Sequence, residues 1–347
     1  MYGRVVSLRL TLVARTMKSF NIMKLTLLLL ALTSCAALAA TEEQTNKTFQ
    51  VSPGGTLVVD VNFGSIDVST NSADAVAVNL WRKITRGSAE KEQKFLSENP
   101  VVFIQEGNTV TVRCRPKVKE MFHWFSGFRN RNEAKYTIQV PARFNARLNT
   151  SGGGIVASDL TGEVKADTSG GGLRFARLHG PLNGDTSGGG IRVTDCEGPV
   201  KIHTSGGGIE VTGGSGSLNG DTSGGAITVK IFKGPVSMHT SGGGITIENV
   251  AGKVKGDTSG GSIHAVLLSP LPGDVSLSTS GGGVTAKVPA DAAFNLDAET
   301  SGGGISCDLP VTVQGKLDNN RIKGPVNGGG PVLRLGTSGG GIHVQKL

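Results

Sequence analysis

Aspartate and histidine alternate at a fixed spacing in the middle of this chain. Asp185, His203, Asp221, His239 and Asp257 are each separated by eighteen residues. Carboxylates and imidazoles are common metal ligands, and imidazoles also exchange protons near neutral pH. If residues eighteen apart are neighbours in space, this column could bind a metal ion. The alternative is structural, because alternating the two side chains avoids stacking like charges.

The residues beside the column favour the structural interpretation. The residue before each member alternates between glycine and a larger apolar side chain, as in Gly184, Ile202, Gly220 and Met238. Such alternation indicates a packing rule that spans two repeats, which a metal site does not need. We therefore expect a charge ladder that holds no metal.

The column is part of a longer repeat. The spacing between copies of Thr-Ser-Gly-Gly is eighteen residues at first, then twenty-one twice and thirty-seven once, as if loops had been inserted late in the array. A motif in ten copies is typical of a repeat architecture and argues against a single active site. The ten copies begin at Thr150, Thr168, Thr186, Thr204, Thr222, Thr240, Thr258, Thr279, Thr300 and Thr337.

Each repeat contains two turns and two short apolar stretches. The glycines of the motif form one turn, and a later glycine, often followed by proline, forms the other. Every second residue between the turns is apolar, as in Ile191 and Val193 and in Val200 and Ile202, which predicts strands with one buried face. Because two short strands cannot bury that face alone, stacked copies must share a core. We predict an all-β protein, a β-solenoid of about ten short coils.

The part before the repeats lacks this strict period. We expect residues 41–148 to form irregular β-rich coils and a cap, and residues 149–347 to form the TSGGGI-repeat solenoid. Residues 63–70, FGSIDVST, look like a degenerate repeat, and residues 87–98 are the one plausible helix. A cap is expected because the first strand of the solenoid would otherwise be an open edge.

One segment of this N-terminal part concentrates aromatic side chains in a chain that is only 5% aromatic. Aromatic residues interleaved with arginine are typical of binding hot spots and of loops at a membrane interface. The alternative is a hydrophobic plug that closes the end of the solenoid. The candidate binding residues are Phe122, Trp124, Phe125, Phe128, Arg129 and Arg131.

Residues 1–40 have the composition of an export leader. Lys24 precedes an apolar run, and the small residues of a signal-peptide cleavage site end at Ala39. Cleavage there predicts a protein of the periplasm, of the outer membrane or cell surface, or of the extracellular medium. The sequence LTSC, which ends at Cys35, also fits a lipobox. In that case Cys35 would carry lipid and attach the protein to a membrane.

Charge and cysteine content exclude several classes of protein. The formal net charge is +8, but residues 1–40 hold five of the basic residues and no acidic one, which leaves 30 basic against 27 acidic residues. A basic surface for nucleic acid is therefore not expected. Cys114, Cys196 and Cys307 are too far apart for a disulfide framework or a metal knuckle. We expect them to be buried free thiols, and we expect no cofactor.

Several of these motifs resemble those of a known group. The export leader, the stretch from Phe49 to Val59 with its PGGTLVV, the GSIDV unit and the serial TSGGGI repeats are similar to the bacterial putative-adhesin family. The resemblance implies a β-solenoid at or beyond the cell envelope. It brings no catalytic residues with it.

These observations favour a non-catalytic exported protein, adhesin-like or structural, whose partner is a protein or glycan of the envelope or surface. The main alternative is a polysaccharide-active β-helix enzyme, which would need paired carboxylates that break the repeat. A third interpretation is binding to ice or crystal surfaces through outward threonines. The alternation from Val200 through Ile202 instead places Thr204 inward.

Overall fold

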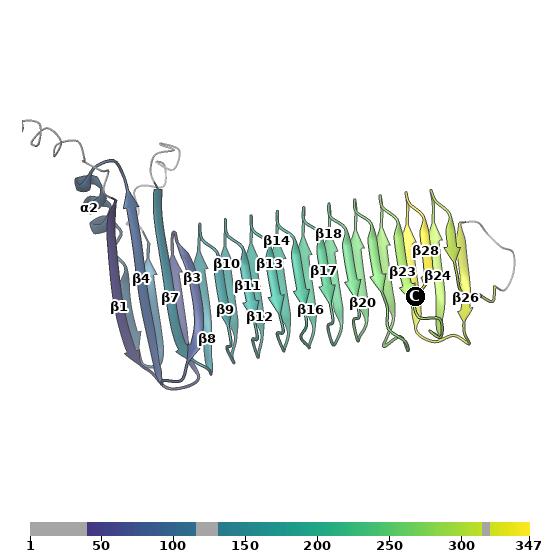
Figure 1. Ribbon diagram of the computed structural model, residues 1–347, viewed down its shortest axis with the longest axis horizontal. Helices are drawn as coiled ribbons and strands as arrows, with labels where there is room; N and C mark the ends of the chain where they lie inside the picture. Colours follow the sequence, from purple (N-terminus) through teal and green to yellow (C-terminus); the bar gives the residue numbers. More distant parts are fainter. Residues whose placement is uncertain (1–39, 116–130, 314–319) are drawn as a thin grey trace, which may run out of the picture.

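The computed structural model describes residues 40–115, 131–313 and 320–347. These residues form a rod in which short strands stack along the long axis (Figure 1). Two sheets of fourteen strands each extend along the rod, and the helix α2 (Ala89–Glu98) lies at the N-terminal end. The predicted all-β solenoid is confirmed.

Sheet A contains the strand that follows each Thr-Ser-Gly-Gly motif, together with strands of the N-terminal part. In spatial order its strands are β1 (Thr41–Gln50), β4 (Ala75–Thr85), β7 (Arg131–Pro141), β3 (Ser65–Asn71), β9 (Ile155–Ser158), β11 (Leu173–Ala176), β13 (Ile191–Thr194), β15 (Ile209–Thr212), β17 (Ile227–Lys230), β19 (Ile245–Glu248), β21 (Ile263–Val266), β23 (Val284–Val288), β28 (Ile342–Lys346) and β25 (Ile305–Cys307).

Sheet B contains the strands that end in the motif threonines. In spatial order its strands are β26 (Arg321–Val326), β24 (Phe294–Thr300), β27 (Val332–Thr337), β22 (Val275–Thr279), β20 (Val254–Thr258), β18 (Val236–Thr240), β16 (Leu218–Thr222), β14 (Val200–Thr204), β12 (Leu182–Thr186), β10 (Val164–Thr168), β8 (Phe144–Thr150), β2 (Gly55–Val61), β6 (Thr109–Cys114) and β5 (Val102–Glu106).

Residues eighteen apart are paired in neighbouring parallel strands throughout the regular repeats. Ile191 pairs with Ile209 in sheet A, and Val200 pairs with Leu218 in sheet B. Ile191, Val193, Val200 and Ile202 are at most 2% exposed, as predicted. Burying one such side chain contributes about 1.5–3 kcal/mol. The continuous core between the two sheets therefore stabilises coils that would not fold singly.

The motif threonines link each coil to the one before it. The Thr204 hydroxyl donates to the carbonyl oxygen of Gly189 at 2.7 Å and accepts from the amide of Gly207 at 3.2 Å. The ten threonines are at most 7% exposed, so the inward orientation predicted for Thr204 is confirmed. Because they are buried, these threonines cannot form the outward array that binding to ice would need.

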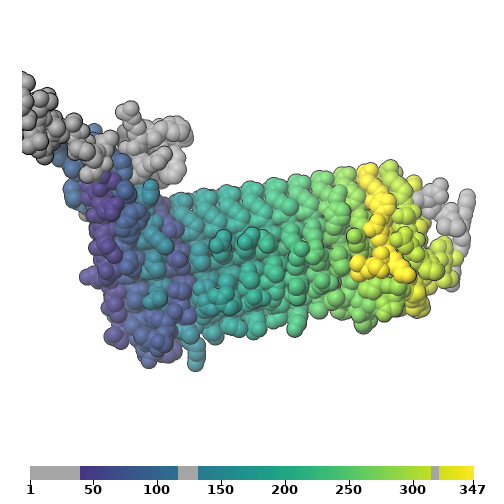
Figure 2. All heavy atoms as spheres, viewed as in Figure 1, coloured from purple at the N-terminus to yellow at the C-terminus, as the bar shows by residue number. Residues whose placement is uncertain are grey.

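The last coil is stacked out of sequence order. Strand β27 lies between β22 and β24, and β28 lies between β23 and β25. The Thr337 hydroxyl donates to Gly282 O at 2.7 Å, and the Thr300 hydroxyl donates to Gly340 O at 2.8 Å. Figure 2 shows the yellow C-terminal residues between greener coils on both sides. The long spacing before Thr337 thus contains a reversal of direction, in which β26 pairs antiparallel with β24.

The N-terminal end mixes coil strands with antiparallel strands. The predicted degenerate repeat forms β3, where Ile66 pairs with Ile155 of the first regular coil. Beyond β3 and β7, the strands β4 and β1 continue sheet A in antiparallel pairing. The predicted helix is α2, and the Ser88 hydroxyl at its N-cap accepts from the amide of Lys91. Ser88 is a preferred N-cap residue because its side chain satisfies a free helical amide.

Ile231 has a backbone conformation that its side chain disfavours. Its φ is +54°, in the left-handed region where Asn249 and Gly213 of the adjacent coils also lie, and its side chain is 61% exposed. A β-branched residue is strained there by about 1–2 kcal/mol. We therefore expect Ile231→Asn to raise the free energy of unfolding by about 1 kcal/mol in denaturant titration. Ile231→Val keeps the branched Cβ and should give no gain; an equal gain would contradict the strain.

Candidate functional site

The Asp/His column lies on the outer face of sheet B. The strand register pairs Asp185 with His203, His203 with Asp221, Asp221 with His239, and His239 with Asp257. His203 Nδ1 lies 3.8 Å from an Asp221 carboxylate oxygen, and both side chains are exposed. Exposed pairs of this kind contribute about 0–1 kcal/mol. Within residues 40–115, 131–313 and 320–347, no three His, Cys, Asp or Glu side chains are placed to hold a metal ion.

The same column continues to Asp167, which lies beside Asp185. Partial burial raises the pKa of the Asp167 carboxyl above its usual value; nearby Lys165 opposes this rise, and the Asp185 carboxylate adds to it. Ionising Asp167 is therefore less favourable in the folded protein than in the unfolded chain. The column thus contains one pair of stacked like charges that the alternating pattern does not relieve.

This pair predicts a stabilising substitution with a definite pH dependence. Because the folded pKa is raised, the contribution of Asp167 to stability falls as pH rises through and above its ordinary pKa. Asp167→Asn removes this loss, so its melting temperature should exceed that of the parent at pH 7 and match it near pH 2. The control is Asp221→Asn, which removes the carboxylate beside His203 and should give no increase. A lower melting temperature for Asp167→Asn at pH 7 would contradict the destabilisation that burial and the Asp185 charge impose on the ionised carboxylate.

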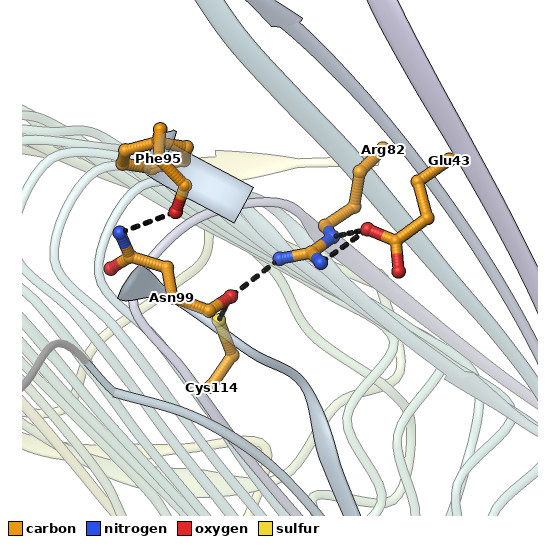
Figure 3. A network of polar contacts seen from close by, with 5 residues as sticks. All are labelled: Glu43, Arg82, Phe95, Asn99 and Cys114. Carbon is orange, nitrogen blue, oxygen red and sulfur yellow. Dashed lines mark hydrogen bonds and ion pairs between the residues drawn. The ribbon is translucent and has the colours of Figure 1, made fainter. Parts of the chain in front are cut away.

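A buried arginine lies at the centre of a polar cluster near the N-terminal end (Figure 3). Arg82 of β4 is 1% exposed, and its guanidinium donates to the Glu43 carboxylate of β1 through Nε, at 3.0 Å, and Nη2. Its Nη1 donates to the carbonyl oxygen of Asn99 at 2.8 Å. The Cys114 thiol donates weakly to the same oxygen at 3.7 Å, and the Asn99 side-chain amide donates to Phe95 O.

The sequence analysis did not identify this cluster, although one signal was present. In the alternating stretch of β4, Val78, Leu80, Arg82 and Ile84 share the buried face. A charge at such a position indicates a buried ion pair, since an isolated buried charge is very costly. Its partner Glu43 could not be chosen from the sequence, because it comes from a different strand.

A second carboxylate fixes the start of β1 to the helix. Glu92 of α2 is 3% exposed and accepts hydrogen bonds from the amide and hydroxyl of Thr41, at 3.0 and 2.7 Å, and from the amide of Arg86 at 2.9 Å. These hydrogen bonds, that of Arg86 first, lower the pKa of Glu92. The two clusters hold β1 against β4 and α2. Their groups are engaged with one another, as expected for structural contacts.

Three cysteines lie among the described residues, and each is a free thiol. Cys114 and Cys196 are buried as predicted, whereas Cys307 is only partly buried. The prediction for Cys307 was wrong because its strand, β25, is the outermost strand of sheet A and pairs only with β28. Burial raises the pKa of all three thiols, which lowers the fraction of nucleophilic thiolate.

The candidate binding residues Phe122, Trp124, Phe125, Phe128 and Arg129 lie outside the described residues, and so does Cys35. Arg131 is the first residue of β7. The described chain nevertheless fixes where the flanking segments join the fold. Thr41 of β1 pairs with Ile84 of β4, and Ile84 pairs with Asn132 of β7. The chain therefore enters β1 after the leader, and β7 after the aromatic segment, at the same end of these strands. The two entry points are about 10 Å apart, because one strand lies between them.

Comparison with known proteins decides the family. The model of the family described as Toastrack DUF4097 matches residues 56–345, almost the whole rod. The chain belongs to the Toastrack DUF4097 family. No curated protein matches this Toastrack protein.

Several solved structures match this chain at low sequence identity. A putative adhesin from Parabacteroides distasonis is 11% identical, with 87% of this chain and 97% of that chain covered and a TM-score of 0.36. A putative lipid binding protein from the same species is 12% identical, with 88% and 97% covered and a TM-score of 0.37. A putative adhesin from Bacteroides fragilis is 13% identical, with 88% and 97% covered and a TM-score of 0.24.

Among the described residues, no helix has both the length and the apolar character needed to cross a bilayer.

Proposed function

We propose that this Toastrack protein is a non-catalytic, exported, adhesin-like binding protein of the cell envelope. Its N-terminal end attaches to the envelope, and the solenoid extends from there as a rigid rod. The single observation that carries this proposal is the register of sheet A. Thr41 and Asn132 are aligned across β1, β4 and β7. The leader with Cys35 and the segment with Trp124 and Phe125 are thus joined to strands of sheet A at the same end of those strands.

The strength of the N-terminal contacts supports this orientation. A protein tethered through the residues before Thr41 transmits any load to β1. Strand β1 is fixed by ten residue pairs with β4, by the ion pair of Glu43 with Arg82, and by the hydrogen bonds of Thr41 to Glu92. The repeated coils, in contrast, stack the same backbone unit in one register from β8 to β22. They provide length and stiffness, and the envelope contact is assigned to the N-terminal end.

The double variant Trp124→Ala/Phe125→Ala tests the attachment. We expect it to reduce binding to isolated cell envelopes by at least tenfold, because truncating aromatic anchors commonly costs about 2 kcal/mol or more. The melting temperature should change little. The control is Ile104→Ala, which removes an exposed apolar side chain from β5. A large fall in melting temperature with unchanged attachment would mean that the aromatic residues plug the core.

Cys35→Ser separates the two possible modes of attachment. If Cys35 carries lipid, this variant moves from the membrane fraction to the soluble fraction, although its aromatic segment is unchanged. If the leader is removed after Ala39, the variant and the parent are distributed identically. In both cases the protein is exported; retention of the parent in the cytoplasm would contradict the proposed function.

A further inference from the structure

A groove extends along the outer face of sheet A, across five consecutive coils. Its floor is the backbone of the third motif glycine in successive coils, including Gly172, Gly190 and Gly208. One side is formed by the outward residues two positions later, including Arg174, Arg192 and Glu210. Because the coils are spaced by about 4.8 Å, the groove is about 20 Å long and straight.

The glycines of the floor are not required by the packing of the coils. A Cβ on Gly208 would lie 3.0 Å from the carbonyl oxygen of Ala226, a tight contact that small backbone shifts can relieve. Ala226 and Ser262 occupy the same position of the repeat in two other coils. The fold thus accepts a side chain there, and the run of glycine from Gly154 to Gly208 leaves the floor of the groove open.

The row of residues that forms the floor of the groove continues through the N-terminal strands to an aromatic side chain, Trp81. The Ile66 amide donates to the carbonyl oxygen of Gly154, which places Ser65 next to the floor. Ser65 pairs with Lys135, and Lys135 pairs with Trp81. Trp81 points outward from β4 and is partly exposed. An exposed indole provides a flat apolar surface with a polar edge.

The charges along the groove are mixed. Arg192 and Glu210 pair at 2.6 Å, whereas Arg174 and Lys135 are exposed and have no partner among the described residues. With Asp67 in the same row as Arg174, three cations face two carboxylates. This near balance suits neither a polyanion nor a polycation. It suits hydroxyl groups, which both donate and accept hydrogen bonds.

We propose that this groove binds an extended, neutral, β-linked glycan chain. The straight floor admits a straight polymer whose sugars repeat at close to the coil spacing. Arg174, Arg192 and Glu210 hydrogen bond successive sugar hydroxyls, and the Trp81 ring stacks on a sugar at one end of the chain. This inference rests on the proposed function, in which the protein is a binding protein, and it names the class of partner for the rod.

The test is calorimetric titration of the processed protein with cellohexaose and chitohexaose. We expect one of them to bind, with affinity rising from the disaccharide to the hexasaccharide as more coils are contacted. Maltohexaose, which is α-linked and helical, should bind at least tenfold more weakly. Trp81→Ala and Arg174→Ala should each weaken binding about tenfold. Lys201→Ala, which removes an exposed cation from sheet B, should leave binding unchanged.

A matched pair of glycine variants tests the groove itself. Gly190→Ser places a side chain in the middle of the floor and should weaken binding at least tenfold while the melting temperature stays near that of the parent. Gly283→Ser makes the same change at the same repeat position beyond the groove and should bind like the parent.

Three results would overturn the proposal, and they leave the proposed function standing if the protein still attaches to envelopes. One is that none of the β-linked oligosaccharides binds. Another is that binding occurs and is indifferent to Trp81→Ala, Arg174→Ala and Gly190→Ser. The third is that polyglutamate or polygalacturonate binds more tightly than the neutral chains, which would make the partner an acidic polymer.

Discussion

Gly207→Ala is expected to lower the free energy of unfolding by about 3 kcal/mol or more and to disrupt the solenoid near its middle. Gly207 is the second glycine of its motif, and a Cβ there would lie well inside contact distance of the Gly189 carbonyl in the preceding coil. The neighbour is backbone in the corresponding turn of the adjacent coil, so it cannot move without disturbing the stack. Overpacking of a close-packed interior is costly for this reason. The measurement is chemical denaturation followed by far-UV circular dichroism.

The neighbouring glycine provides the matched control. Gly208→Ala adds the same methyl group one residue later, where Ala226 and Ser262 show that a side chain is accepted. We expect it to change the free energy of unfolding by less than about 1 kcal/mol. If the two variants are equally stable, the second glycine is not required by sterics, and the explanation given for the motif is wrong.

Glu43→Ala is expected to destabilise the N-terminal end by about 3 kcal/mol, because it leaves the Arg82 guanidinium buried without its counter-ion. Arginine remains protonated in proteins, so Arg82 cannot escape the penalty by losing its charge. Removing one partner of a buried pair commonly costs about 3–5 kcal/mol. Since the Glu43 side chain is itself 36% exposed, water offsets part of that cost, and the lower end of the range applies.

Glu42→Ala is the control for this prediction, because it is the same substitution in the preceding residue of the same strand. Glu42 pairs with Lys83 at 3.1 Å, and both side chains are at least 40% exposed. Such a pair contributes about 0–1 kcal/mol. Hydrogen exchange of the β1 and β4 amides measures both variants locally. Equal protection of these amides in Glu43→Ala and Glu42→Ala would contradict the role of the buried ion pair.

The stacking of the repeats could be predicted because it depends on local rules. An apolar alternation that returns every eighteen residues can bury its face in only one way, with Ile191 beside Ile209 and Val200 beside Leu218. The inward orientation of Thr204 followed from the same alternation. The same argument places the column from Asp185 to Asp257 on one face. It does not show which members form a close ion pair, because that depends on side-chain conformations; His203 and Asp221 form one.

The contacts at the N-terminal end could not be predicted, because they join residues far apart in the sequence. Glu43 meets Arg82, and Thr41 meets Glu92. Each contact depends on how antiparallel strands and a helix close the end of the rod, and no period in the sequence encodes this. The groove from Gly154 to Ala226 was missed for a related reason. The sequence indicates only that the glycines of its floor form a turn. The strand register, which the sequence does not reveal, aligns this floor with Trp81 on a strand outside the repeats.

The solenoid, its eighteen-residue register and the side chains that face the core follow from the sequence alone, because they depend on short-range alternation and on the stacking of similar units. The order of the coils at the C-terminal end does not follow from it, since β27 and β28 insert between two earlier coils. Each coil offers nearly the same backbone edge and the same threonine contact to its neighbour. The local pattern is therefore satisfied by either order, and the antiparallel return through β26 selects the one observed.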